Sequence, residues 1–169
     1  MKIFKYAVWI IVLFLIQTVI ANEIQIMSLC SDVILPFLVL TALREDSFKT
    51  STAVAIVCAV MSGALCGRNF TFVVLFYTYV SAIVFNMRKF MGMVPDFMRY
   101  LLWTFMAGTV SEIISYLILY MSFKWFLKGL ILYMIPAALY TTVIAAVLYP
   151  LMRSTLYGQG NGKKQLIVK

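Results

Sequence analysis

Long apolar runs separated by short polar segments dominate the chain. They cover Tyr6–Ala21, Ile24–Leu43, Thr52–Cys66, Phe70–Asn86, Tyr100–Ser122 and Leu127–Leu151. A helix of about 20 apolar residues spans the hydrocarbon core of a bilayer, which is about 30 Å thick. The pattern therefore predicts an all-α, polytopic membrane bundle of about six transmembrane helices in residues 1–157, followed by a flexible cytoplasmic tail at 158–169.

The composition favours a membrane protein over a soluble one. Hydrophobic residues make up 64% of the chain and charged residues only 12%, whereas soluble domains contain about 25% charged residues. With 169 residues, six such helices leave no room for a separate soluble domain.

The basic residues predict the orientation of the helices, because cytoplasmic loops of membrane proteins are enriched in Lys and Arg. If the N-terminus is cytoplasmic, the cytoplasmic segments contain Lys2, Lys5, Arg44, Lys49, Arg88, Lys89, Arg99, Arg153, Lys163, Lys164 and Lys169. The outer loops then contain only Arg68, Lys124 and Lys128. We therefore expect a multi-pass protein of the cell (cytoplasmic) membrane with both termini in the cytoplasm.

The residue types present argue against an enzyme. Histidine is absent, which removes Ser-His and Cys-His nucleophilic sites and the His-containing zinc motifs of intramembrane proteases. Cys30, Cys58 and Cys66 are interpreted as small packing residues. We expect no catalytic, cofactor or metal site, and the net charge of +8 reflects membrane topology and does not indicate a nucleic-acid partner.

The second apolar run is irregular because it contains Asp32. Either Asp32 is buried within the bundle, or Glu23–Ser31 forms a loop or interfacial helix in the outer leaflet. The second interpretation is favoured, since Asp32 then serves as the N-cap of a helix with Pro36 close to its first turn.

Small residues recur at helical spacing in two runs. In the third run they are Ser51, Ala55, Ala59, Gly63 and Gly67, and in the sixth Ala137, Ala138, Thr141, Thr142, Ala145 and Ala146. Helices in lipid associate through close backbone packing, so such stripes predict tight helix contacts, with a neighbouring span or with another protein. Pro136 is expected to kink the sixth helix or mark a break in it.

Glu112 lies near the centre of the fifth run. Gly108, Ser111 and Ser115 are three or four positions from it or from each other, which places them on one side of a helix. A carboxylate at this depth is costly unless it is paired, so Glu112 is either a functional site or a structural hydrogen bond to a facing helix. No second acid lies opposite it, which argues against a proton pump.

Several segments together resemble the bacterial rod shape-determining protein MreD family. These are the basic first helix, the stretch Ser31–Arg44, the small-residue hairpin Gly63–Arg68 and the closing stretch Ile135–Arg153. The resemblance extends from about Lys5 to Tyr157. Family members usually have a proline where this chain has Ser31, and often an Asp in the hairpin, where this chain has Ser62 or Gly63.

The resemblance implies a non-enzymatic scaffold of the cell-elongation machinery that maintains rod shape. Its partners would be the single-span protein MreC, the other elongation proteins MreB, RodA and a class B penicillin-binding protein, and membrane lipids. The scaffold would help to position or regulate peptidoglycan synthases.

The family fold is similar to that of the S components of energy-coupling-factor vitamin transporters, which supplies the alternative function. S components dock their energising partner through an Ala-x-x-x-Ala stripe on the first helix. Here that helix is bulky almost throughout, which favours the scaffold.

If Glu112 makes a structural hydrogen bond, we predict that Glu112→Gln is tolerated for folding, because an amide retains hydrogen-bonding capacity, whereas Glu112→Leu impairs assembly. The measurement is the recovery of folded protein and of its complex after detergent purification. Normal cell shape and normal complex recovery in the Leu variant would exclude any role for Glu112.

Overall fold

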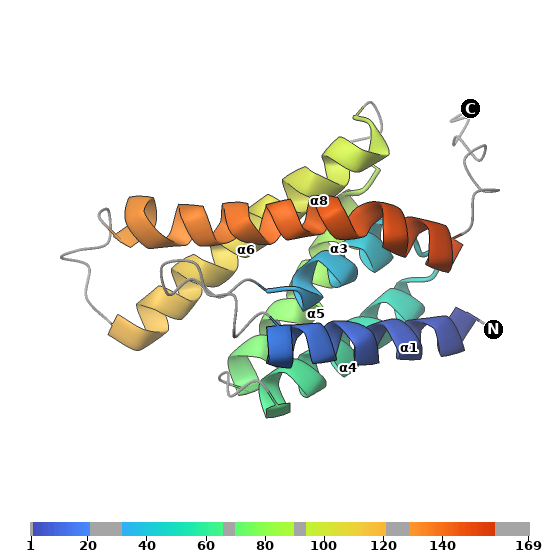
Figure 1. The fold of residues 1–169 in the computed structure, drawn as a ribbon, viewed down its shortest axis with the longest axis horizontal. Coiled ribbons are helices and arrows are strands. Elements are labelled where there is room, and N and C mark those ends of the chain that lie inside the picture. Colours follow the sequence, from blue (N-terminus) through green and yellow to red (C-terminus); the bar gives the residue numbers. More distant parts are fainter. Residues whose placement is uncertain (1, 21–31, 66–69, 90–93, 121–128, 158–169) are drawn as a thin grey trace.

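The structure is a computed structural model that describes residues 2–20, 32–65, 70–89, 94–120 and 129–157. Within these ranges the chain is all-helical, with six helices and no strand, which confirms the predicted all-α class. In chain order they are α1 (Lys2–Leu15) continued by the π-helix η1 (Ile16–Ile20), α3 (Ile34–Arg44), α4 (Phe48–Leu65), α5 (Phe70–Met87), α6 (Asp96–Tyr120), and the π-helix η3 (Leu130–Met134) continued by α8 (Ile135–Tyr157) (Figure 1).

Each predicted span corresponds to one helix, but the helices differ in length. By length and composition, two helical stretches are able to cross a membrane, Phe70–Met87 and Leu132–Tyr157. Ile3–Val19, Ile34–Arg44 and Phe48–Ala64 are shorter apolar helices. The second span was predicted to begin at Ile24, and residues 24–31 of it lie outside the described residues, as does the tail at 158–169.

Helix α3 forms the centre of the bundle. Every residue from Ile34 to Ala42 is buried, and α3 contacts α1, α4, α5, α6 and α8 (Figure 1). Its one polar side chain in this stretch, Thr41, donates its hydroxyl hydrogen to the carbonyl of Leu38 at 2.9 Å. A helix that is apolar on all sides has to be enclosed by others, and the other helices surround this short one.

The small-residue stripe of α4 lies inside the bundle. Ala55 and Ala59 are fully buried, and the Ser51 and Ser81 hydroxyl oxygens of α4 and α5 are 2.9 Å apart. A Cβ at Gly63 would lie only 2.9 Å from Phe70 Cδ2 and 3.1 Å from Phe70 Cα. The contact is therefore with the neighbouring helix α5, as the first of the two alternatives predicts. Gly67 lies outside the described residues.

Helices α6 and α8 pack in the same way. A Cβ at Gly108 would lie 3.5 Å from both Cα and Cβ of Ala138, which is fully buried. Thr142 is half-buried and donates its hydroxyl hydrogen to the carbonyl of Ala138 at 2.7 Å. Pro136 lies in the first turn of α8, immediately after the π-helical turn η3, so the predicted break coincides with a change of helix type.

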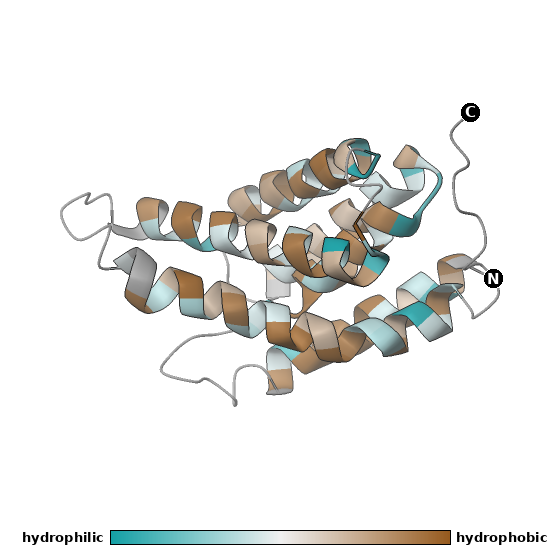
Figure 2. Ribbon diagram, turned by 90° about the horizontal axis from the view of Figure 1, so that it is seen from above, coloured by the Kyte–Doolittle hydropathy of each residue, from teal (hydrophilic) through white to brown (hydrophobic). Residues whose placement is uncertain are grey.

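Large apolar side chains cover the outward faces of the helices. On α8 the exposed set recurs every four residues: Leu139, Val143, Val147 and Leu151. On α1 it comprises Ile3, Phe4, Val8, Ile11, Val12 and Leu15. Figure 2 shows apolar segments along the length of the helices and the most hydrophilic ones mainly toward the end where α1 begins and α8 ends. Soluble monomers rarely expose continuous apolar surface of this extent.

We predict that Gly63→Ala destabilises the protein by about 1–3 kcal/mol, because the added methyl group would lie only 2.9 Å from the ring and 3.1 Å from the backbone of Phe70. Ala64→Val is the control, since Ala64 is the next residue of the same helix and is exposed. Thermal or denaturant unfolding in detergent measures the difference. Equal stability of the two variants would show that α4 and α5 do not approach closely at Gly63.

Candidate functional site

Asp32 caps the buried helix α3. Its Oδ1 accepts hydrogen bonds from the backbone N–H groups of Ile34 and Leu35, both at 3.2 Å. Val33 already has helical dihedral angles (φ −75°, ψ −21°), so Asp32 is the residue that precedes the first helical turn. These bonds agree with the predicted N-cap. Asp32 is also buried within the bundle, with 6% of its surface exposed, as the alternative that was not favoured predicts, and residues 23–31 lie outside the described residues.

Side chains from three further elements converge on this cap. Tyr77 of α5 donates its hydroxyl hydrogen to Asp32 Oδ2 at 2.7 Å. Gln17 of η1 accepts the Val33 N–H at 2.6 Å through Oε1, and Thr141 of α8 accepts the Asp32 N–H at 3.3 Å through Oγ1. We call Gln17, Asp32, Tyr77 and Thr141 the buried polar cluster. It ties four elements together at the start of α3.

The buried polar cluster has a structural role, because its polar groups bond to other groups of the chain. Both carboxylate oxygens of Asp32 accept hydrogen bonds from groups of the chain itself, and a buried carboxylate is stable only when it is bonded in this way. Among the described residues, no three His, Cys, Asp or Glu side chains gather in a way that could hold a metal ion.

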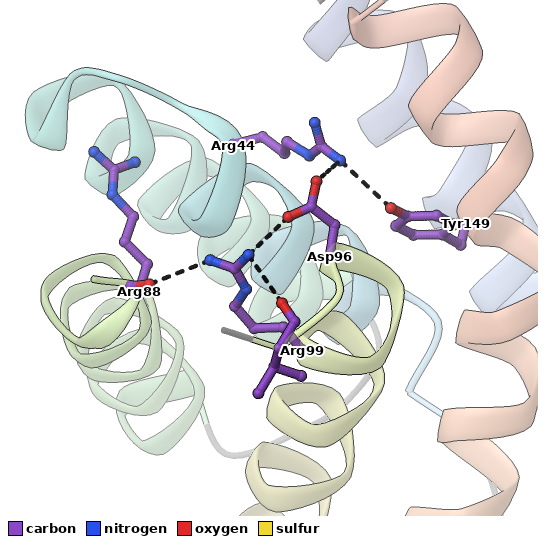
Figure 3. Close-up of polar contacts among 6 residues, drawn as sticks. Arg44, Arg88, Asp96, Arg99 and Tyr149 are labelled. Carbon is purple, nitrogen blue, oxygen red and sulfur yellow. Dashed lines mark hydrogen bonds and ion pairs between the residues drawn. The ribbon is translucent and has the colours of Figure 1, made fainter. Parts of the chain in front are cut away.

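A second polar network lies at the opposite end of α3. Arg44 and Arg99 both pair with Asp96, at 2.7 Å to Oδ2 and Oδ1 respectively. Arg44 also donates to the Tyr149 hydroxyl at 3.4 Å, and Arg99 to the carbonyl of Arg88 at 3.2 Å. Figure 3 shows the two guanidinium groups converging on one carboxylate between α3, α6 and α8. These residues form the charged end of the bundle.

The first helix joins the charged end through its first turns. Tyr6 donates its hydroxyl hydrogen to the Glu45 carboxylate, and Arg88 donates to the Glu45 carbonyl. Lys5 bonds the carbonyl of Thr155 at 2.9 Å, and Trp9 donates to the Thr155 hydroxyl at 2.8 Å. The polar contacts therefore bring together the start of α1, the end of α3, the end of α5, the start of α6 and the end of α8.

An apolar groove of about 500 Å³ lies between α5 and α6. These two helices contact each other far less than α4 and α5 do. The α5 wall consists of Phe72, Leu75, Phe76, Tyr79, Val80, Ile83 and Val84, and the α6 wall of Trp103, Met106, Ala107, Val110 and Ile114. The sequence did not indicate this groove, because every one of these residues also fits a lipid-facing or core position.

The residues proposed from the sequence lie in several different places. Gly108 and Ser111 are buried in α6, while Glu112 and Ser115 are half-buried. Glu112 is not among the residues that line the groove. Asp32 lies in the buried polar cluster, and its contacts approach the α6 group: Leu35, whose backbone N–H bonds Asp32 Oδ1, has its Cδ2 4.0 Å from where a Cβ on Gly108 would lie. The proposed role of Glu112 in partner binding stays a prediction.

Sequence reasoning missed two members of the buried polar cluster. Gln17 interrupts the first apolar run, and this was a usable signal that a polar group is satisfied inside the bundle. Tyr77 carried no such signal, since it is one of 10 tyrosines.

Comparison with known proteins identifies no relative: no family model, no curated protein and no solved structure matches the chain.

We predict that Tyr77→Phe destabilises the protein by about 1.5–3 kcal/mol, because a buried carboxylate loses the hydrogen bond from the Tyr77 hydroxyl. Tyr79→Phe is the matched control, since Tyr79 lies on the same helix with 70% of its surface exposed. In the Asp32→Ala background the cost of Tyr77→Phe should be much smaller, because the carboxylate is gone. Equal costs in both backgrounds would contradict the coupling.

Proposed function

We propose that this protein is a non-enzymatic, multi-pass scaffold of the cell membrane, with both termini in the cytoplasm. The observation that carries the proposal is the distribution of side chains. Inside the bundle, small and polar residues lie at the helix contacts beside an apolar core, and large apolar residues also cover the outward faces of the helices. This distribution suits a bundle whose solvent is lipid, since close backbone packing holds such helices together.

The charged end supports the orientation. Arg44, Arg88, Arg99 and Lys5 belong to segments for which the basic residues predict a cytoplasmic location, and their contacts gather them at one end. An even number of crossings accounts for this arrangement, because it returns the end of α8 to the side where α1 begins.

The resemblance to the MreD family supplies the partner. We propose that the chain binds the transmembrane helix of an MreC-like single-span protein and so helps to position the peptidoglycan synthases of cell elongation. The small-residue stripes of α4 and of α6 with α8 are occupied by contacts within the chain. A partner helix therefore docks on the larger apolar side chains of the outer surface.

The alternative, a vitamin-binding S component, finds less support. The buried polar groups that are best placed to orient a ligand bond to one another, and the outward face of α1 is bulky. Retention of a vitamin through purification would favour this alternative over the scaffold.

We predict that the protein copurifies with the MreC-like protein of its host when the two are coexpressed and extracted in mild detergent, and that its depletion makes rod-shaped cells round. Affinity capture measures the first effect and cell width measures the second. A truncated partner that lacks its single span is the control. If the complex forms through the membrane-embedded helix, this truncated partner is not captured.

Two results would contradict the scaffold function. One is failure to recover the partner while an unrelated membrane complex survives the same treatment. The other is unchanged cell width after depletion to undetectable levels.

A further inference from the structure

The groove between α5 and α6 continues toward the end of α5. A second hollow of about 350 Å³ continues it along α5, lined by Tyr79, Ala82, Ile83, Asn86 and Met87. Tyr79 and Ile83 line both hollows. From Phe72 to Asn86 the apolar channel follows α5 for about 20 Å at 1.5 Å per residue. This exceeds the depth of one leaflet, about 15 Å of hydrocarbon.

The channel leads to a cationic rim. Arg88 and Lys89 follow the last residue of α5, and Lys89 is exposed. The guanidinium group of Arg99 lies beside Arg88, with its Nη1 3.2 Å from the Arg88 carbonyl oxygen. Asp96 is shared between Arg44 and Arg99, while the Arg88 guanidinium donates to the Glu45 carbonyl and lies over the Phe85 ring. Within the described part of the chain, no ion pair neutralises Lys89.

We propose that this channel binds an acyl chain of an anionic phospholipid, whose phosphate lies against Lys89 and Asn86. The proposal rests on the membrane location proposed above. An apolar channel with a cationic end matches an amphiphile with an apolar tail and an anionic head. The rim lies at the end of the bundle proposed to be cytoplasmic, and anionic lipids are concentrated in the cytoplasmic leaflet.

The charge at the rim disfavours a partner helix as the occupant. Single-span proteins carry basic residues on the cytoplasmic flank of their helix. Such a flank would face Lys89, and like charges in a poorly solvated setting repel each other. The phosphate of a lipid meets Lys89 with the opposite sign.

The test compares lipid retention among variants. Protein purified in detergent is exposed to equal amounts of phosphatidylglycerol and phosphatidylcholine, and native mass spectrometry counts the bound molecules. We expect preferential retention of phosphatidylglycerol. Lys89→Gln should reduce it about fivefold, the factor for one basic side chain near an anionic head group. Lys49→Gln, an exposed lysine at the same end but on α4, should leave it unchanged.

A second pair of variants examines the channel. Ile83→Trp should fill it and reduce the retention of both lipids, whereas Ile56→Trp on α4 should not. The two isoleucines are exposed to similar extents, 41% and 43%. If Ile83→Trp aggregates, the lysine pair decides alone.

Three results would overturn the proposal: equal losses in the two lysine variants, unchanged lipid retention in a folded Ile83→Trp variant, or loss of the single-span partner and not of lipid in that variant. The last would assign the channel to a helix. Absence of the wild-type protein from washed membranes would instead contradict the membrane location, so the two failures are distinguishable.

Discussion

The arrangement of the bundle depends on which groups accept hydrogen bonds from the backbone N–H groups in the first turn of α3. This helix is enclosed on all sides, and the N–H groups of its first turn have no partner within the helix. Asp32 supplies one, and the same carboxylate accepts the Tyr77 hydroxyl hydrogen from α5. Gln17 and Thr141 bond the neighbouring backbone groups. One requirement of local helix chemistry thus fixes where η1, α5 and α8 approach α3.

Small side chains set the distances between the other helices. Gly63 against Phe70 and Gly108 against Ala138 allow α4 to approach α5 and α6 to approach α8. No small residue on α5 and α6 serves the same purpose along the groove, where both walls are formed mainly by bulky side chains. Bulky side chains keep helix backbones apart. The groove therefore forms because α4 packs closely on α5 and α6 on α8, whereas α5 and α6 pack loosely on each other.

Local features were predictable from the sequence, and tertiary ones were not. The six helices followed from apolar run length, and the Asp32 cap followed from its position before Pro36, since capping involves residues close in the chain. Tyr77 is 45 positions from Asp32, and nothing in its own surroundings marks it as the partner. The small-residue stripes indicated a close contact, but their pattern does not say which helix makes it. The groove depends on a pair of helices at once, so no single run reveals it.

The proposed lipid and the proposed partner helix would occupy different faces of the bundle. If a lipid occupies the groove between α5 and α6 as proposed, the exposed apolar side chains of α1, α4 and α8 are available to the proposed partner helix. Helices α1 and α8 are joined at the charged end through Lys5, Trp9 and Thr155, and both carry exposed aliphatic rows. A helix on that face would meet Lys5 and Arg153 with its cytoplasmic flank. Such a partner needs an acidic residue there, or its flank has to end before it reaches them.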